Sequence, residues 1–229
     1  MKAVVLASGG LDSTVTAAVA KRDGCDLYLL TIAYGQRHRI EVERARHIGV
    51  ALGVAGHLVL ELDLRAIGGS ALTGEQAVPK NRSGAERAAG IPVTYVPARN
   101  TIFLSLALAY AETQKAAWIY FGANVVDYSG YPDCRPEYLR AFEEVARLGT
   151  KAGVAGVAIG IRAPLLHMTK ADIIRQGLAV GAPLHLTHSC YDPASEGAAC
   201  GRCDSCRIRL EGFKEAGIVD PVAYAGTIS

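Results

Sequence analysis

The chain has 229 residues, of which 50% are hydrophobic and 20% are charged, and its formal net charge is +2 at pH 7. This composition buries one substantial core, so we expect residues 1–229 to form a single domain. The small net charge argues against a nucleic-acid partner, and the lack of a long apolar run or a signal peptide predicts a cytoplasmic protein without a membrane partner.

The first part of the chain alternates strand and helix patterns. Residues 2–7 are a continuous β-branched and apolar run that ends at two glycines, before a segment rich in Ala, Val and Thr. We expect a buried strand, a tight turn and a helix start there. Residues 27–33 and 57–62 predict two more strands, with a helix over 40–52 between them. Strands alternating with helices predict an α/β fold with a doubly wound, Rossmann-like and mainly parallel sheet.

The middle of the chain opens with a segment of weak pattern. Residues 65–97 are rich in Gly, Ser, Pro and charge, which is typical of a long surface excursion that forms a lid or a substrate loop. Thr169 followed by Asp172 resembles a capping box and predicts a helix start. We expect helices over 101–112 and 136–148 and from Thr169 to about Gly181, and strands over 118–122 and 157–161.

The turn after the first predicted strand reads Ser-Gly-Gly-Leu-Asp-Ser at residues 8–13. Between a strand and a helix start, free backbone N–H groups and the positive helix end converge on one point, which suits an anion. Glycines let the backbone curl around phosphate oxygens, and the hydroxyls of Ser8, Ser13 and Thr14 add donors. The turn has neither the lysine of a P-loop nor the spacing of a dinucleotide fingerprint. The alternative is an ordinary Gly-rich turn that caps the helix.

Residues 34–39, Tyr-Gly-Gln-Arg-His-Arg, follow the second predicted strand. They therefore emerge at the carboxyl edge of the sheet, where ligands bind in open α/β folds. We expect Arg37 or Arg39 to neutralise a carboxylate or a phosphate there, the alternative being a solvated basic loop.

Residues 97–100, Pro-Ala-Arg-Asn, precede an apolar helix and reach the same edge. We expect Arg99 to contact a phosphate or a carboxylate. Asn100 is predicted at the helix N-cap, where it acts either as a cap alone or also as a substrate contact.

Residues 127–137 combine aromatic rings, carboxylates and a turn. A guanine-type ring offers adjacent N–H donors that Asp133 or Glu137 accepts, while Tyr128 or Tyr131 stacks on its face. The segment therefore predicts a seat for a base, and the alternative is a Pro-rich turn that caps the following helix.

Four of the six cysteines are spaced C-x9-C-x2-C-x2-C. This spacing lets four thiolates converge on a tetrahedral ion and leaves no position for water, so we expect a structural zinc-binding segment at 188–206 that holds the C-terminal region to the sheet edge. An iron–sulfur cluster takes the same ligands and stays open at this point. Cys134 stands apart, has no identified base partner and is expected to be inert. The predicted metal ligands are Cys190, Cys200, Cys203 and Cys206.

The turn at 8–13 resembles the pyrophosphate-binding loop of the ATP pyrophosphatase (PP-loop) superfamily, whose members cleave ATP to AMP and pyrophosphate. Lys170 resembles that superfamily's downstream phosphate-contacting lysine, although a solvated surface lysine is as plausible from sequence. Together with the strings at 34–39, 97–100 and 129–135 and the four cysteines, the turn resembles the 7-cyano-7-deazaguanine synthase family over most of the chain.

This resemblance implies an adenine nucleotide alpha hydrolase-like fold and an ATP-dependent carbon–nitrogen ligase of queuosine biosynthesis. In such a ligase ATP adenylates 7-carboxy-7-deazaguanine, ammonia converts the adenylate to an amide, and a second ATP dehydrates the amide to the nitrile. The resemblance also implies ATP, Mg²⁺ and Zn²⁺ as cofactors, and a homodimer. The expected catalytic residues are Asp12, Arg99 and Lys170; the nucleotide-binding residues Ala7, Ser8, Gly9, Gly10, Leu11, Asp12, Ser13 and Thr14; and the substrate contacts Tyr34, Gln36, Arg37, Arg99, Asn100, Tyr131, Asp133, Arg135 and Glu137.

Two other interpretations stay open from the sequence. One is a different PP-loop enzyme that amidates a small molecule or modifies tRNA, although the near-neutral charge argues against tRNA. The other is a non-catalytic zinc module, which leaves the turn at 8–13 unexplained. Ala7 and Ala98 depart from the residues common in the resembled family, a larger residue and a glycine, but neither removes a donor or a ligand.

Overall fold

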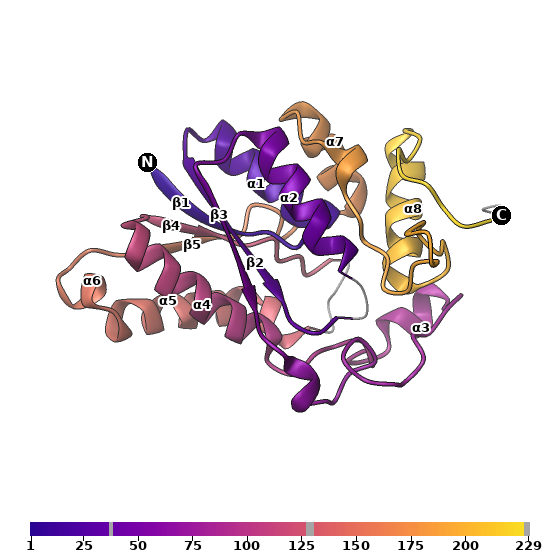
Figure 1. Cartoon of the computed structure of the whole chain (residues 1–229), viewed down its shortest axis with the longest axis horizontal. Coiled ribbons are helices and arrows are strands. Elements are labelled where there is room, and N and C mark those ends of the chain that lie inside the picture. The colour runs from indigo at the N-terminus through magenta and orange to yellow at the C-terminus, as the bar shows by residue number, and fades with distance from the viewer. Residues whose placement is uncertain (37–38, 127–130, 227–229) are drawn as a thin grey trace.

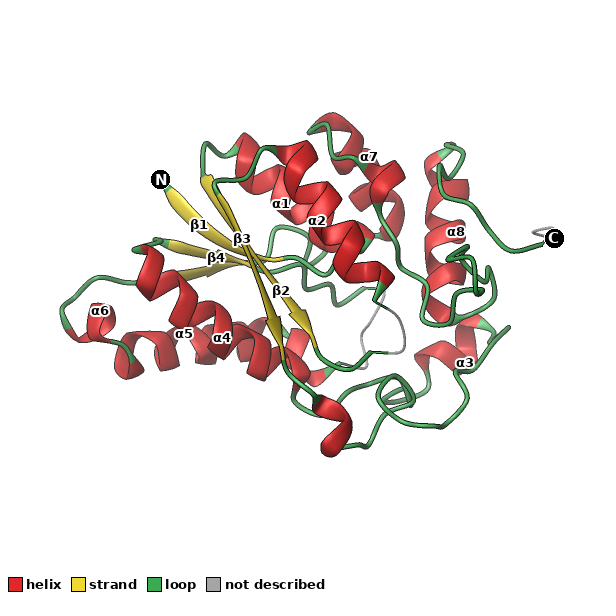
Figure 2. Cartoon of the chain, in the orientation of Figure 1, coloured by secondary structure: helices red, strands yellow, loops and turns green. Residues whose placement is uncertain are grey.

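The computed structural model of the chain describes residues 1–36, 39–126 and 131–226 (Figures 1 and 2). In chain order its elements are β1 (Lys2–Leu6), α1 (Leu11–Arg22), β2 (Asp26–Ala33), α2 (Ile40–Leu52), β3 (Gly56–Glu61), η1 (Leu64–Ala66), α3 (Gly84–Ala88), α4 (Arg99–Gln114), β4 (Trp118–Tyr120), η2 (Pro132–Cys134), α5 (Pro136–Gly149), α6 (Lys151–Val154), β5 (Gly160–Arg162), α7 (Lys170–Ala179), η3 (Leu184–Leu186) and α8 (Asp204–Ala216).

The strands form one parallel sheet in the order β3-β2-β1-β4-β5. β1 is central, and its Val4 pairs with Tyr28 of β2 on one side and Ile119 of β4 on the other. Because the strand order reverses between β1 and β4, the connections that follow these two strands diverge and leave a crevice at their carboxyl ends. The sheet confirms the predicted doubly wound α/β fold.

Helices cover both faces of the sheet, with α1, α2 and α7 on one face and α4 and α5 on the other (Figure 1). Val4 and Leu6 belong to the core under α4 and α5, whereas Ala3 and Val5 belong to the core under α1 and α7. β1 is buried on both faces, which explains why its sequence is apolar without alternation. In the described part of the chain, no helix has the length and apolar character needed to cross a membrane.

The excursion predicted at 65–97 lies against the cysteine segment rather than standing free. The Asn81 N–H donates to the Arg202 carbonyl (2.8 Å), and Arg82 Nη1 lies 2.8 Å from Asp204 Oδ2 at the start of α8. These contacts brace the region beyond the carboxyl ends of the strands, where α3 and α8 lie side by side in Figure 1.

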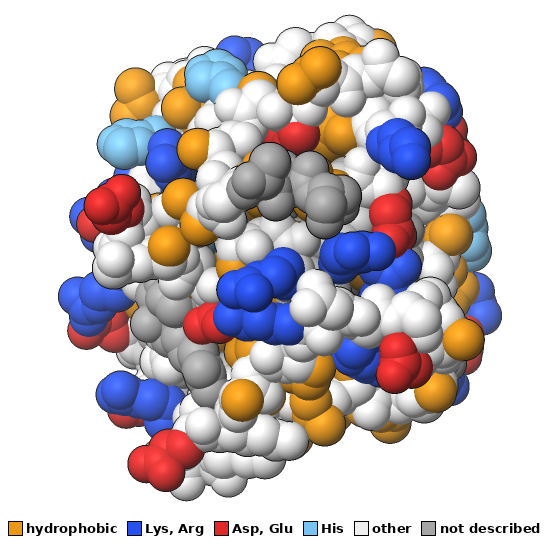
Figure 3. All heavy atoms as spheres, turned by 90° about the vertical axis from the view of Figure 1, so that its right-hand side faces the viewer, with side chains coloured by type: hydrophobic (Ala, Val, Ile, Leu, Met, Phe, Trp, Pro, Cys, Tyr) orange, Lys and Arg blue, Asp and Glu red, His pale blue; other side chains and the backbone are white. Residues whose placement is uncertain are grey.

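Figure 3 shows the side of the molecule that carries α3 and α8, with Lys and Arg side chains gathered near its middle. Ion pairs join this region together: Lys80 Nζ lies 2.6 Å from Asp192 Oδ2, and Arg87 Nη2 lies 2.8 Å from Glu211 Oε2. Opposite charges on the excursion and on the C-terminal region therefore face each other, and each of these partly exposed pairs contributes no more than about 1 kcal/mol to their contact.

The structure corrects the predicted N-cap of the fourth long helix. α4 begins at Arg99, one residue before Asn100. Its N-cap is Ala98, which adopts the left-handed conformation (φ 51°). Asn100 is not the cap because its side chain donates instead to the carboxylate of Asp133.

Two elements were misplaced or missed. The strand predicted at 157–161 runs from Gly160 to Arg162, because the chain turns at Gly156 (φ 77°) and leaves Val157 60% exposed. α8 was not predicted, because most of its buried residues are polar or small and give no apolar periodicity: Asp204, Ser205, Cys206, Arg209, Gly212 and Phe213. By contrast, the capping box of Thr169 and Asp172 is confirmed at the start of α7.

Arg209 of α8 is 2% exposed and is paired with Asp220, which follows α8 in the chain. Nε lies 2.7 Å from Oδ2 and Nη2 lies 2.9 Å from Oδ1, and the Tyr224 hydroxyl donates to the same carboxylate (2.6 Å). Arg209 Nη1 also donates to Thr187 Oγ1 (2.7 Å). This buried, bidentate ion pair between Arg209 and Asp220 therefore connects α8 to the last part of the described chain.

We expect Asp220→Ala to lower the free energy of unfolding by about 3–5 kcal/mol, because it leaves the buried Arg209 charge without its partner. Urea unfolding followed by circular dichroism measures this change. Glu196→Ala removes an exposed acid of the same region and should change stability by no more than about 0.5 kcal/mol. A loss for Asp220→Ala no larger than that of this control would contradict the anchoring role.

Candidate active site

The turn between β1 and α1 exposes backbone donors at the carboxyl edge of the sheet. Gly10 is the N-cap of α1, and no side chain caps the helix. Ser8 Oγ accepts the Gly10 N–H (3.2 Å) and lies 3.0 Å from Ser13 Oγ, which fixes the curl of the turn. Within the described residues, the N–H groups of Asp12 and Ser13 donate to no protein acceptor, so they are available to an anion at the positive end of α1.

Gly9 occupies a position that admits no side chain. Its φ is 83°, and a Cβ there would lie 2.2 Å from the carbonyl oxygen of Glu41 in the first turn of α2. On the opposite side, a Cβ at Gly122 after β4 would lie 3.3 Å from the Ser13 nitrogen. The turn is thus held between the start of α2 and the end of β4, which fixes the direction of its N–H groups.

Lys170 brings a buried cation to the same turn. It is the first residue of α7 and is 7% exposed, and its Nζ lies 2.6 Å from Asp12 Oδ1. A positive charge at a helix N-terminus is opposed by the helix dipole, so a lysine there needs anions close by. Asp12 supplies one of them, and the position suits a phosphate as another.

A cavity of about 230 Å³ opens over this turn and extends across the ends of β2 and β4. It collects most of the residues expected at the site from the sequence. Those that line it are Ala7, Ser8, Gly10, Leu11, Asp12, Ser13, Tyr34, Gln36, Arg99, Asn100, Tyr131 and Lys170.

Other predicted site residues lie elsewhere. Gly9, Thr14 and Asp133 are not among the lining residues, and Arg135 and Glu137 are exposed at the start of α5. Two residues of the predicted strings, Arg37 and Tyr128, lie outside the residues that the structure describes.

Arg99 is a second cation that lines the cavity, at the start of α4. Its guanidinium lies 5.8 Å from the ring centroid of Tyr34 and 5.9 Å from that of Phe103, and its Nη2 donates to Asn100 Oδ1 (3.3 Å). Burial lowers the pKa of Arg99, but the surrounding phenols, Tyr34 first among them, raise it above its ordinary value. Arg99 therefore stays charged and offers guanidinium donors to an anionic group.

The carboxylate of Asp133 serves the backbone of α4. Asp133 is 5% exposed, and its Oδ2 accepts the Asn100 N–H while its Oδ1 accepts the Asn100 side-chain amide, both at 3.1 Å. Burial raises the pKa of the neighbouring Cys134 thiol to about 12. Cys134 is consequently a neutral thiol at physiological pH and not a nucleophile.

The lining residues that were absent from the sequence-based site include three with charged or hydroxyl side chains, Glu41, Ser189 and Arg209. Ser189 Oγ accepts the Leu11 N–H and a hydrogen bond from Arg209 Nη1, both at 3.4 Å, and so links the turn to α8. Ser189 directly precedes the predicted metal ligand Cys190, and this neighbour in the sequence could have indicated that Ser189 lies near the site. Glu41 follows the basic string by two residues, but nothing in the sequence showed that its helix starts against the turn.

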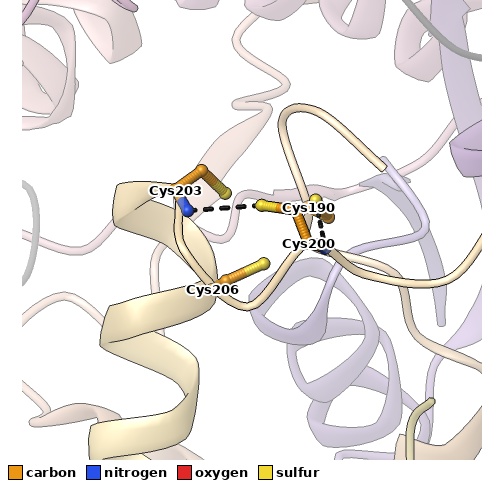
Figure 4. Close-up of side chains that lie close together, drawn as sticks. All are labelled: Cys190, Cys200, Cys203 and Cys206. Carbon is orange, nitrogen blue, oxygen red and sulfur yellow. Dashed lines mark hydrogen bonds between the residues drawn. The ribbon is translucent and has the colours of Figure 1, made fainter. Parts of the chain in front are cut away.

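The four clustered cysteines are all buried, and their sulfur atoms lie within 4.8 Å of one another (Figure 4). Thiolates around Zn²⁺ at about 2.3 Å from the ion stand roughly 3.8 Å apart, so the group fits a tetrahedral ion. The Cys200 N–H donates to Cys190 Sγ (3.2 Å) and the Cys203 N–H to Cys200 Sγ (3.3 Å), as expected around thiolates. Cys203 is the N-cap of α8 and Cys206 lies in its first turn, so the cluster fixes the start of that helix.

Comparison with known proteins agrees with this geometry. Residues 2–217 match the family described as queuosine biosynthesis protein QueC. A 7-cyano-7-deazaguanine synthase from Kineococcus radiotolerans is 58% identical over 224 residues, covering 98% of each chain. A protein of the same name from Syntrophus aciditrophicus is 59% identical over 221 residues, covering 96% of each chain. A third, from Myxococcus xanthus, is 57% identical over 223 residues and covers 97% of each chain.

Solved structures resemble the chain more distantly. The NMN synthetase of Francisella tularensis has a TM-score of 0.50 at 16% identity, covering 95% of this chain and 73% of that one. A predicted subunit of tRNA methyltransferase from Methanocaldococcus jannaschii has a TM-score of 0.50 at 17% identity, covering 98% of this chain and 92% of that one. Such likeness supports the fold and carries no information on the reaction.

Gly9→Ala should abolish ATP binding, because the added Cβ collides with the Glu41 carbonyl and displaces the turn. Gly24→Ala is the matched control: Gly24 has a similar φ of 79°, but no atom lies within 4 Å of its Cβ position. It bears only the conformational strain, about 1–2 kcal/mol. Titration calorimetry with ATP and Mg²⁺ separates the two variants, and equal affinities would show that the turn does not bind the nucleotide.

Proposed function

The chain belongs to the QueC family of queuosine biosynthesis proteins, and from that membership we propose that it is a 7-cyano-7-deazaguanine synthase. In this function it is an ATP-dependent ligase that converts 7-carboxy-7-deazaguanine and ammonia to the nitrile through an adenylate and an amide. The observation that carries the proposal is the identity of 57–59% over nearly the full length of relatives with that name.

The turn at 8–13 supports the role of ATP. A carboxylate is a poor electrophile, and transferring AMP to one of its oxygens creates the leaving group that ammonia displaces. The pyrophosphate released in this step carries negative charge, which the free N–H groups of Asp12 and Ser13 and the Lys170 ammonium are placed to stabilise. We assign the nucleotide's β- and γ-phosphates to this turn, with Ala7, Gly9 and Thr14 shaping it from behind.

Arg99 and the aromatic residues support a site for the acid substrate at the other end of the cavity. The Arg99 guanidinium faces the Tyr34 ring, and Tyr131 lies 5.7 Å from Tyr95 between ring centroids. We assign the substrate carboxylate to Arg99 and the flat 7-deazapurine to the rings of Tyr34 and Tyr131, with Gln36 at the rim. Asp133 contributes by fixing Asn100 and the start of α4.

We propose Zn²⁺ as the ion of the four-cysteine group. Four converging sulfurs suit this ion and leave no open ligand position, so its contribution is to hold the first turn of α8 and the segment that contains Ser189 in place. Mg²⁺ is proposed as the companion of ATP, because the ion is usually held by phosphates and only one or two carboxylates. Asp12 is the carboxylate of the turn that would contact it.

The remaining features of the proposal are a homodimer in the cytoplasm, built from one domain over residues 1–229, that acts on small molecules and not on nucleic acid. Buried thiols that serve as metal ligands suit a reducing compartment, and a net charge of +2 gives no broad basic surface. Sedimentation of the purified protein measures the oligomeric state.

Incubation with 7-carboxy-7-deazaguanine, ATP, Mg²⁺ and ¹⁵N-ammonium should yield a nitrile that carries ¹⁵N, together with AMP and pyrophosphate. Mass spectrometry detects the labelled amide first and the nitrile later, because the amide is the intermediate. Lys170→Met should slow adenylation by roughly 10²–10³-fold through loss of a phosphate contact. Release of ADP in place of AMP, or turnover that does not depend on the acid, would contradict the proposed function.

Cys203→Ser should remove the bound zinc and loosen the excursion that is braced against α8. Metal analysis after gel filtration gives the zinc content, and limited proteolysis reports cleavage within residues 65–97. Cys25→Ser is the control, since Cys25 lies apart from the cluster and should leave one zinc bound. Full zinc content in Cys203→Ser would contradict the assigned ligand set.

A further inference from the structure

The active-site cavity is lined by two carboxylates among the described residues, Asp12 and Glu41. Asp12 is engaged by Lys170 at 2.6 Å. Glu41 has a different setting: it lies in the first turn of α2, and its own carbonyl oxygen is the atom that abuts Gly9. Glu41 lines the cavity beside the phosphate turn, and its carboxyl is close enough to Arg99 to interact with the guanidinium charge. The steps described above assign it no role.

Glu41 lies close both to the turn after β1 and to Arg99. Behind it lies the turn assigned to the β- and γ-phosphates, and its charge is felt by Arg99 and Tyr34, at the end assigned to the acid substrate. These are the charged and titratable groups that face it from α4 and from the end of β2. The α-phosphorus of ATP and the substrate carboxylate have to meet between the turn and Arg99, and Glu41 is near both.

The surroundings of Glu41 bring the pKa of its carboxyl close to neutral pH. Glu41 is half-buried, and burial raises its pKa to about 7, against the lowering effect of the Arg99 charge. At neutral pH both protonation states are populated, which is the condition under which a carboxylate acts efficiently as a base.

Amide formation from ammonium requires a base in the cavity. At neutral pH dissolved ammonia is almost entirely ammonium, which has no lone pair and cannot attack a carbonyl carbon. The cavity also carries the cations Lys170, Arg99 and Arg209, which repel ammonium. A cation can enter and lose a proton there only next to an anion that is not already neutralised by an ion pair.

We propose that Glu41 binds ammonium and accepts its proton, so that ammonia is released next to the adenylated carboxyl carbon. The proposal rests on the proposed function and names the base for its amide-forming step. One N–H bond of ammonium breaks and the proton moves to the Glu41 carboxylate. The freed lone pair forms the C–N bond, the bond between the carbonyl carbon and the AMP oxygen breaks, and the second proton leaves the nitrogen with the departing AMP phosphate.

Glu41→Gln tests the proposal, and Glu43→Gln is the matched control, because both acids lie in the first turn of α2 but Glu43 is exposed. With ammonium chloride we expect kcat/KM of Glu41→Gln to fall by about 10²-fold or more, and that of Glu43→Gln to stay close to wild type. With hydroxylamine, which is already unprotonated at neutral pH, Glu41→Gln should form the hydroxamate within a few-fold of the wild-type rate.

The pH profile adds a readout that a merely structural role would not change. In the wild-type protein, kcat/KM for total ammonium should rise as Glu41 ionises and then level off. In Glu41→Gln the nucleophile has to come from free ammonia in solution, so kcat/KM should keep rising in proportion to hydroxide through the range where the wild type is level.

Equal losses with ammonium and hydroxylamine, or parallel pH profiles, would overturn the role of Glu41, since they would place its effect on ATP or on the acid substrate. A wild-type protein that forms neither amide nor nitrile would count against the proposed function instead. Thermal melting of both variants identifies any loss that is due to unfolding.

Discussion

The close approach of the β1–α1 turn to the first turn of α2 is the constraint on which the site depends. Gly9 adopts a left-handed conformation with the Glu41 carbonyl where a side chain would stand, and this contact forces the following N–H groups to point into the cavity. The His188 N–H donates to the Gly9 carbonyl from the opposite side (2.9 Å). A single contact thus shapes the turn and sets Glu41 beside it, so that the proposed phosphate binding and the proposed supply of ammonia share one structural origin.

The C-terminal region contributes to the same turn from outside the sheet. The cysteine group sets the first turn of α8, and one turn further along the helix Arg209 reaches Ser189, whose hydroxyl accepts the Leu11 N–H. Asp220 neutralises the buried guanidinium and leaves one of its nitrogens directed at Ser189 and Thr187. Because Cys190 lines the same cavity, an ion held by the cysteines would in this way stabilise the geometry of the proposed nucleotide site from its border.

The sequence predicted what depends on local chemistry. The continuous apolar run of β1, the glycine turn before α1 and the capping box of Thr169 are each specified by neighbouring residues, and all three are present in the structure. α8 could not be predicted because its buried face gains stability from cysteine ligands, glycine and an ion pair that residues distant in sequence complete. Asn100 was expected at the helix N-cap and Asp133 as an acceptor for a bound base, but they bond to each other across 33 residues, a pairing that only tertiary contact reveals. The position of Glu41 was missed for the same reason, since helical pattern does not tell what a first turn packs against.

The most direct measurement of the central claim is a crystal structure with Mg²⁺ and an ATP analogue whose α,β-bridge cannot be cleaved. The account predicts that the β- and γ-phosphates accept hydrogen bonds from the Asp12 and Ser13 N–H groups, with the α-phosphorus directed at the space between Glu41 and Arg99. Phosphates bound at another place in the molecule, with the turn after β1 in contact only with solvent, would contradict it.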